Sequence, residues 1–219
     1  MSLAIFDLDN TLLGGDSDHA WGEFLVKNKR VDAQWYQQKN DAFYQDYQQG
    51  NLDMHAYQNF VLSVLAANPL DTLNRWSEQF LEDVVGPMIL PKGLELIQRH
   101  RDQGDHLLII TATNDFITAP IAKLLGIDDL IATTAERSET GYTGKIFGTP
   151  SFQAGKIERL NLWLKNKGID MTGAWFYSDS HNDLPLLRLV DNPVAVDPDD
   201  ILKAKAQENN WKIISLRSN

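Results

Sequence analysis

The first residues of the chain contain the feature that most constrains its fold. A short, mainly apolar run, residues 3–8, contains the carboxylate Asp7 near its end and is followed directly by a second carboxylate, Asp9. The length and composition of this run predict a buried strand of a parallel sheet. A lone acidic pair at such a place is more often an acidic turn. Burying unpaired charge is costly, however, so a pair that ends a central strand also points to chemistry at the carboxyl edge of the sheet.

Composition narrows the possible partners of this 219-residue chain. Its net charge of −10 disfavours nucleic acid and anionic membranes, because both require a basic surface. The chain has no cysteine, which excludes disulfides and thiolate metal sites. No apolar run is long enough to cross a bilayer, and the first strand begins too early for a signal peptide, so we expect a cytoplasmic protein. Whether it is a monomer or a homodimer is left open.

Helical periodicity dominates residues 15–86. Trp21, Phe24 and Leu25 mark one apolar face, and a second segment carries Trp35 and Phe43 at helical spacing. Asp53 and Asp71 are placed to cap two further helices, and Gly86-Pro87 is expected to end the last of them. The region shows no strand pattern and predicts a small helical insert.

After residue 86, helix and strand patterns alternate. Strands are predicted at 106–111, 130–134, 174–177, 193–196 and 212–216, a β-hairpin at 139–147, and helices at 91–104, 115–125, 155–167 and from about 199. This alternation predicts an α/β fold with a Rossmann-like, doubly wound parallel sheet. We therefore expect an α/β core domain of residues 1–14 and 87–219, interrupted after its first strand by a helical cap domain of residues 15–86.

Polar side chains follow the ends of three predicted strands, and a lysine begins the helix before the last of them. These residues are Asp7 and Asp9, Thr111, Lys156, and the group Asp179, Asn182 and Asp183. Each has an ordinary explanation alone, as a strand-end hydroxyl, a solvated lysine or a helix-capping cluster. The carboxyl ends of parallel strands meet at one edge of a sheet, so we expect these side chains to converge there.

Such a set suits phosphoryl transfer from a monoester. Gathered carboxylates repel one another unless a cation neutralises them, and an all-oxygen site favours Mg²⁺. Asp7 could attack phosphorus and form an aspartyl-phosphate, while Asp9 protonates the leaving alkoxide and later deprotonates the hydrolytic water. The Thr111 hydroxyl and the Lys156 ammonium would hold the phosphoryl oxygens.

These residues resemble a known family. Residues 7–12 resemble the D-x-D-x-T signature of the haloacid dehalogenase-like (HAD) phosphatases, and Thr111, Lys156 and residues 179–183 fit the second, third and fourth motifs in order. A helical insert directly after the first motif resembles the C1 cap of the phosphoserine phosphatase-like subgroup (subfamily IB), which closes over the substrate. The resemblance therefore implies a phosphoric monoester hydrolase with a Rossmann-like core.

The resemblance also implies a metal site. Mg²⁺ would be bound by Asp7, by the backbone carbonyl of Asp9 and by Asp179, and Asp183 would support the metal directly or through water. Asn182, in the same motif as Asp183, is a candidate for substrate binding.

The start of the insert bears on the substrate. Asp16, Asp18 and His19 are candidate substrate-binding residues, because carboxylates near aromatic rings suit a small phosphorylated metabolite with a cationic leaving group. Between Arg30 and Arg75 the chain has no arginine for the carboxylate of phosphoserine. Residues 15–23 also resemble proteins related to HAD-type histidinol-phosphatases, which implies histidinol phosphate as the substrate and a place in amino-acid biosynthesis.

Several alternatives stay open. Asp16 and Asp18 could simply cap the first helix of the insert. The substrate could be phosphoserine or a related small molecule. A phosphotransferase would pass the phosphoryl group to an alcohol instead of water. A catalytically silent module that binds a phosphometabolite would need no paired nucleophile and acid.

Overall fold

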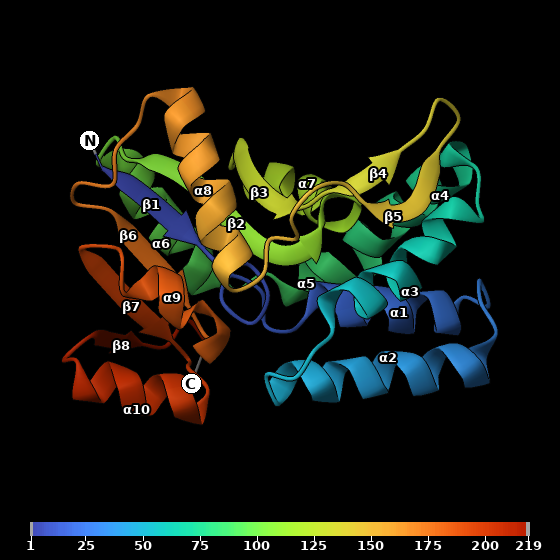
Figure 1. Ribbon diagram of the computed structural model, residues 1–219, viewed down its shortest axis with the longest axis horizontal. Coiled ribbons are helices and arrows are strands. Elements are labelled where there is room, and N and C mark those ends of the chain that lie inside the picture. Colours follow the sequence, from blue (N-terminus) through green and yellow to red (C-terminus); the bar gives the residue numbers. More distant parts are fainter. Residues whose placement is uncertain (1, 218–219) are drawn as a thin grey trace.

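A computed structural model describes residues 2–217, which form a six-stranded parallel sheet with helices on both faces (Figure 1). The strands lie in the order β3-β2-β1-β6-β7-β8, and every neighbouring pair is parallel. They are β1 (Leu3–Phe6), β2 (His106–Asn114), β3 (Asp129–Thr133), β6 (Trp175–Ser178), β7 (Asn192–Val196) and β8 (Lys212–Ile214). The predicted doubly wound α/β fold is confirmed, and the order of the strands reverses at β1.

Alternate residues of the central strand β1 contribute to two apolar layers. Ala4 and Phe6 pack on the side of α6 (Pro91–Asp102) and α7 (Asp115–Leu124). Leu3 and Ile5 pack on the side of α8 (Ala154–Lys167), α9 (Leu184–Leu187) and α10 (Asp200–Glu208). Burial on both faces explains the continuous apolar run in the sequence, and each large apolar side chain buried there stabilises the fold by about 1.5–3 kcal/mol.

The insert is helical, as predicted, and lies to one side of the sheet (Figure 1). Its helices are α1 (Ser17–Lys27), α2 (Ala33–Gln48), α3 (Met54–Ala66) and α4 (Leu70–Phe80), followed by the π-helical turn η1 (Leu81–Val85) and the short α5 (Gly86–Met88). The chain enters and leaves the insert at adjacent places, because the amide of Gly14 donates to the carbonyl of Met88 and the amide of Leu90 donates to that of Leu12.

Three details of the insert differ from prediction. Asp53 caps α3 as expected, but Asp71 lies inside the first turn of α4, after the cap residue Pro69. Gly86-Pro87 does not end the helix, because Pro87 falls in the first turn of α5, where its missing N–H is not needed. Trp35 is 53% exposed, and the neighbouring Tyr36 points inward in its place.

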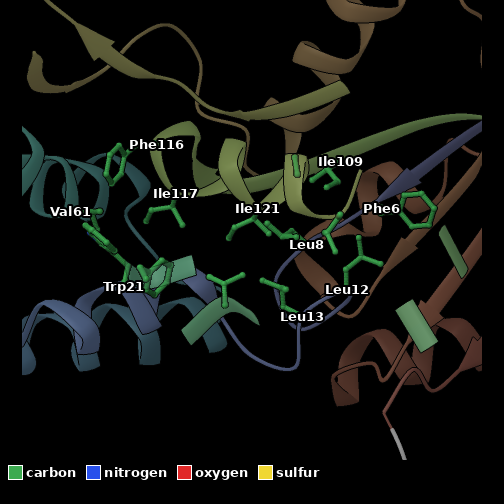
Figure 2. Close-up of a cluster of buried hydrophobic side chains, with 14 of the residues drawn as sticks. Phe6, Leu8, Leu12, Leu13, Trp21, Val61, Ile109, Phe116, Ile117 and Ile121 are labelled. Atoms are coloured by element: carbon green, nitrogen blue, oxygen red, sulfur yellow. The ribbon is translucent and has the colours of Figure 1, made fainter. Parts of the chain in front are cut away.

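One apolar cluster runs without a break from the sheet into the insert. Figure 2 shows it passing from Phe6 and Leu8 through Ile121 to Trp21 and Val61. The boundary between core and cap domains at residues 14 and 87 stays a prediction. None of the helices in residues 2–217 is long and apolar enough to cross a membrane.

A β-hairpin of the core chain also joins the insert. It consists of β4 (Ala135–Arg137) and β5 (Tyr142–Ile146), so its first strand begins earlier than the predicted 139–147. β5 lies along α3 (Figure 1). Gly144 has a φ of +83°, and a Cβ there would lie 3.2 Å from the Cβ of Ala66, so glycine permits this close approach.

One strand of the core extends beyond its predicted bounds, and one helix tolerates an internal proline. β2 continues to Asn114 rather than ending at Thr111, since its last residue still pairs with Thr133 of β3. Helix α7 forms as predicted and continues through Pro120. The buried side chains of Ile117 and Ile121 hold the helix in place despite the lost backbone hydrogen bond.

Candidate active site

The predicted site residues converge at the carboxyl ends of β1, β2 and β6. This is the place where the strand order reverses, at which open α/β sheets bind ligands. The amide of Asp7 donates to the carbonyl of Tyr177 at 2.9 Å, so the end of β1 is tied to β6. One pocket is lined by both the strand ends and the insert, and five of its residues are the acids Asp7, Asp9, Asp16, Asp18 and Asp183.

Lys156 lies between two of these carboxylates. Its Nζ is 2.8 Å from Oδ1 of Asp7 and 2.7 Å from Oδ1 of Asp183, and all three side chains are buried. Burial raises the pKa of Asp7 to about 7, although the charge of Lys156 opposes the rise. The two acids raise the pKa of Lys156 against the effect of its burial, so the lysine stays charged. The prediction that Lys156 reaches this edge is confirmed.

A tight turn places Lys156. Its helix α8 begins at Ala154, after Gln153, whose φ is +48°. A Cβ on Gly155 would lie 2.1 Å from the carbonyl oxygen of Pro150, so only glycine fits at this position. The side chain of Gln153 donates to Oδ1 of Asn182 at 3.0 Å, which ties this turn to the loop after β6.

Asp9 is held by hydrogen bonds from both the insert and the core. Its Oδ1 accepts from the amide of Ser17 at 2.6 Å, and its Oδ2 accepts from the hydroxyl of Thr113 at 2.9 Å. Thr111 is more distant, with its hydroxyl 3.5 Å from Oδ2 of Asp9. Burial raises the pKa of Asp9 to about 6, in spite of these donors. A carboxyl group with this pKa suits general acid–base work near neutral pH.

Asp179 completes the acidic edge. Its Oδ1 accepts from the hydroxyl of Thr11 at 3.1 Å, and its amide donates to the same hydroxyl oxygen at 3.1 Å. Burial, then the charges of Asp7 and Asp183, raise its pKa well above the ordinary value. Among residues 2–217, Lys156 forms ion pairs with Asp7 and Asp183 and none with Asp179, so the site holds more negative than positive charge.

The donor set can be tested for its fit to Mg²⁺. Within residues 2–217, no three acidic or histidine side chains are arranged to enclose a metal by themselves. Both oxygens of Asp183 are engaged by Lys156, and its Oδ2 also accepts from the hydroxyl of Ser178 at 2.7 Å. The carboxylates of Asp7 and Asp179 remain, and their excess charge and all-oxygen chemistry fit a hard cation that keeps several waters.

The candidates at the start of the insert have different surroundings. Asp16 caps α1, because its Oδ1 accepts from the amide of His19 at 2.8 Å, so the capping alternative holds for this residue. The His19 ring stacks on Tyr44, with 4.5 Å between ring centroids, and the amide nitrogen of Asn40 lies 3.0 Å from its Nδ1. Asp18 is 4% exposed, and neither of its carboxylate oxygens has a hydrogen-bond partner in the described chain. All three residues line the pocket.

Four positioning residues were missing from the predicted site: Thr11, Ser17, Thr113 and Ser178. Thr11 belongs to the D-x-D-x-T pattern, so a signal for it was present in the sequence. Thr113 follows Thr111 by two residues, and period-two alternation along a longer strand would have placed both on one face. The aromatic side chains that line the pocket also come from unpredicted positions, such as Tyr47 and Phe152, whose ring centroids lie 6.5 Å apart.

The fold and the site together are those of a class of hydrolases. Comparison with known proteins identifies this class. The family model for haloacid dehalogenase-like hydrolase matches residues 4–188. The chain belongs to this family, as its motifs predicted.

Individual relatives extend the likeness. The chain is 45% identical over 220 residues to a histidinol-phosphatase of Neisseria meningitidis serogroup C (strain 8013), a match that covers 99% of each protein. A crystal structure of a protein with unknown function from Bordetella pertussis Tohama I superposes with a TM-score of 0.93 at 40% identity, and covers 99% of each chain. A phospho-aspartyl intermediate analogue of phosphoserine phosphatase superposes with a TM-score of 0.72 at 17% identity, over 100% of this chain and 94% of that one, which is a likeness of fold.

Proposed function

We propose that this protein is a Mg²⁺-dependent phosphomonoesterase that acts on a small phosphorylated metabolite with a cationic leaving group, and that histidinol phosphate is its substrate. One observation carries the proposal. Asp7 and Asp9 line the same pocket, and each is held in place by a separate set of donors. A binding module would not require two buried carboxylates fixed in this way. The 45% identical Neisseria protein named histidinol-phosphatase supports the substrate.

The first half of the reaction transfers the phosphoryl group to the protein. A carboxylate oxygen of Asp7 attacks phosphorus, and the bond from phosphorus to the alcohol oxygen of the substrate breaks. Asp9 donates its proton to the leaving alkoxide, which its raised pKa allows near neutral pH. The Lys156 ammonium, 2.8 Å from Oδ1 of Asp7, holds that carboxylate and offers positive charge to the phosphoryl oxygens. The hydroxyl of Thr111 has the same proposed role towards these oxygens.

The second half releases phosphate. Asp9, now a carboxylate, takes a proton from water while the water oxygen attacks phosphorus, and the bond from phosphorus to Asp7 breaks. Hydrogen bonds from Ser17 and Thr113 keep Asp9 in one orientation through both steps. Mg²⁺, held by Asp7, the carbonyl of Asp9 and Asp179, would neutralise the phosphate dianion at this acidic edge. Asp183 supports the site indirectly in this proposal, since Lys156 and Ser178 engage its oxygens.

The pocket's charge supports a cationic leaving group. Five aspartates line it, while its only lysine, Lys156, is paired with Asp7 and Asp183, and no arginine of residues 2–217 is among its lining residues. An amino acid such as phosphoserine presents a carboxylate, which this lining would repel and leave unpaired. Histidinol phosphate presents an amine and an imidazole and has no carboxylate.

A panel of phosphate esters tests the proposed substrate. We expect phosphate release from histidinol phosphate, without an added acceptor alcohol, at a kcat/KM at least about tenfold above that of phosphoserine, a sugar phosphate or phosphocholine. Faster release from phosphoserine would overturn the substrate. Release that requires an acceptor alcohol would make the protein a phosphotransferase, and no release from any ester would contradict the phosphatase function.

Removal of the metal gives a separate prediction. Treatment with EDTA is expected to lower phosphate release by at least about 100-fold, because the acidic edge would then repel the phosphate dianion. Added Mg²⁺ should restore the original rate, and a thermal melt in EDTA should show that the chain remains folded. Full activity in EDTA would remove the metal from the proposed mechanism.

A further inference from the structure

Two buried polar groups of the insert have no hydrogen-bond partner in the described chain, and one of them, Asp18, lines the pocket. The two carboxylate oxygens of Asp18 and the hydroxyl of Tyr36 lack hydrogen-bond partners in the described chain. Both residues are almost fully buried, at 4% and 1% exposure. Leaving a buried acceptor unpaired is costly, and an unpaired carboxylate more so, so a protein that retains such a group usually uses it.

Asp18 interacts electrostatically with two phenols of the insert. After burial, its negative charge raises the pKa values of both Tyr36 and Tyr57. Tyr57 in turn lowers the pKa of Asp18 as a hydrogen-bonding neighbour, although its hydroxyl makes no hydrogen bond of good geometry to the carboxylate. Asp18 and Tyr57 line the same pocket as Asp7. Asp18 is carried by α1, and the two tyrosines are carried by α2 and α3.

The other candidate substrate-binding residues at this end of the pocket, Asp16 and His19, already have partners within the protein. Asp16 is the N-cap of α1. His19 is engaged by Asn40 and Tyr44, and its Nε2 is 3.9 Å from carboxylates of Glu23 and Asp41. Asp18 therefore differs from its neighbours, because neither of its carboxylate oxygens accepts a hydrogen bond of good geometry from the described chain.

We propose that Asp18, with the hydroxyl of Tyr57 in the same pocket, forms a subsite for a primary ammonium group on the leaving alcohol of the substrate. An ammonium carries three N–H donors on one small centre, which matches two carboxylate oxygens and a phenol oxygen. The charge of the ammonium would compensate that of Asp18, and the aromatic rings would exclude water around the pair. This inference rests on the proposed phosphatase function and names the residues that select its substrate.

The electrostatics of the free protein agree with this subsite. Burial, then the charge of Asp16, raise the pKa of Asp18 well above its ordinary value, and the nearby Tyr57 only partly opposes the rise. An ammonium placed against the carboxylate would reverse this effect and favour the ionised form. A phosphomonoester without a positive charge would leave the group unpaired, and the subsite would therefore discriminate against it.

The test combines two substrates with three proteins. The substrates are histidinol phosphate and its analogue without the amine, 3-(imidazol-4-yl)propyl phosphate, which keeps the imidazole. The proteins are the wild type, Asp18→Asn and the matched control Asp46→Asn, which replaces an exposed carboxylate on α2. The measured quantity is the ratio of kcat/KM for the amine substrate to that for the analogue.

We expect the ratio to be about 100 in the wild type and in Asp46→Asn, and to fall to within a few-fold of one in Asp18→Asn. The melting temperature of Asp18→Asn should not fall, because the change removes a buried carboxylate that has no partner in the protein; a structural role for Asp18 would lower it.

The outcomes separate this inference from the proposed function. A wild type that hydrolyses both esters, with a ratio that Asp18→Asn leaves unchanged, would overturn the ammonium subsite and leave the phosphatase proposal standing. An equal loss of kcat/KM for both substrates in Asp18→Asn would reassign the subsite to the imidazole and also overturn the inference. A wild type that releases no phosphate from either ester, when assayed with Mg²⁺, would instead contradict the proposed function.

Discussion

Asp7→Asn is expected to lower phosphate release by at least about 1,000-fold while the protein stays folded. The amide that replaces the carboxylate cannot act as a nucleophile towards phosphorus, so no aspartyl-phosphate can form. The fold should survive, because Lys156 keeps its contacts with both oxygens of Asp183. Phosphate release under saturating substrate measures the loss, and a thermal melt and far-UV circular dichroism report the fold.

The exposed Asp46 on α2 provides a matched control for this variant. Asp46→Asn makes the same chemical change outside the pocket and should retain wild-type turnover. Hydrolysis by Asp7→Asn at a rate near that of the wild type would falsify the covalent mechanism. A loss of activity accompanied by unfolding would point instead to a structural role for the carboxylate.

Lys156→Met is expected to have the largest effect on stability. Methionine is close to lysine in length, but the change leaves Asp7 and Asp183 buried side by side without their cation. Removing one partner of a buried ion pair costs about 3–5 kcal/mol of unfolding free energy. For a protein of this size, that corresponds to a fall of roughly 6–20 °C in melting temperature. Thermal melts in EDTA, which exclude compensation by a bound cation, measure the effect.

The pH dependence of this defect has a definite sign. The folded-state pKa of Asp7 is already raised to about 7 in the wild type, and loss of Lys156 would raise it further. The folded variant therefore binds more protons than its unfolded state, and its stability falls as the pH rises. The deficit relative to the wild type should be large at pH 8 and smaller at pH 5. Lys165→Met, an exposed change on the same helix, should show no such deficit.

A Lys156→Met protein that is as stable as the wild type at pH 8 would contradict the assignment of Lys156 as the cation that neutralises this pair. A deficit that grows as the pH falls would contradict the sign, and would mean that the carboxylates are more acidic in the folded protein than in the unfolded chain.

Much of the fold and site followed from local patterns. The apolar run at Asp7 and Asp9 identified the central strand. The position of Lys156 at the start of a predicted helix indicated that this lysine lies near the same edge of the sheet. Both signals are short in range and are set by burial, so no knowledge of distant partners was needed to read them.

Other features depended on contacts that a local pattern does not record. The sequence from Ala112 to Asn114 has little strand character, and its extended form depends on pairing with β3. Trp35 and Tyr36 are adjacent aromatic residues on one helix, and the ring of Phe60 on α3 packs on both, with centroid distances of 5.7 Å and 4.5 Å. Their local pattern does not show that Tyr36 is the buried one. Hydrogen bonds such as that from Ser17 to Asp9 depend on how the chain turns into the insert.

That last hydrogen bond has a consequence for protein engineering. The amide of Ser17 belongs to the first turn of α1, so the proposed catalytic acid is held by the same helix that carries Asp18. In a chimera that takes its whole insert from another family member, the new substrate specificity would be accompanied by a change in the hydrogen bond that orients Asp9. Splice points placed after residue 17 would transfer the helices that choose the substrate while keeping the donor to Asp9. Chimeras spliced before and after residue 17 should therefore differ in turnover even when they bind the same phosphate ester.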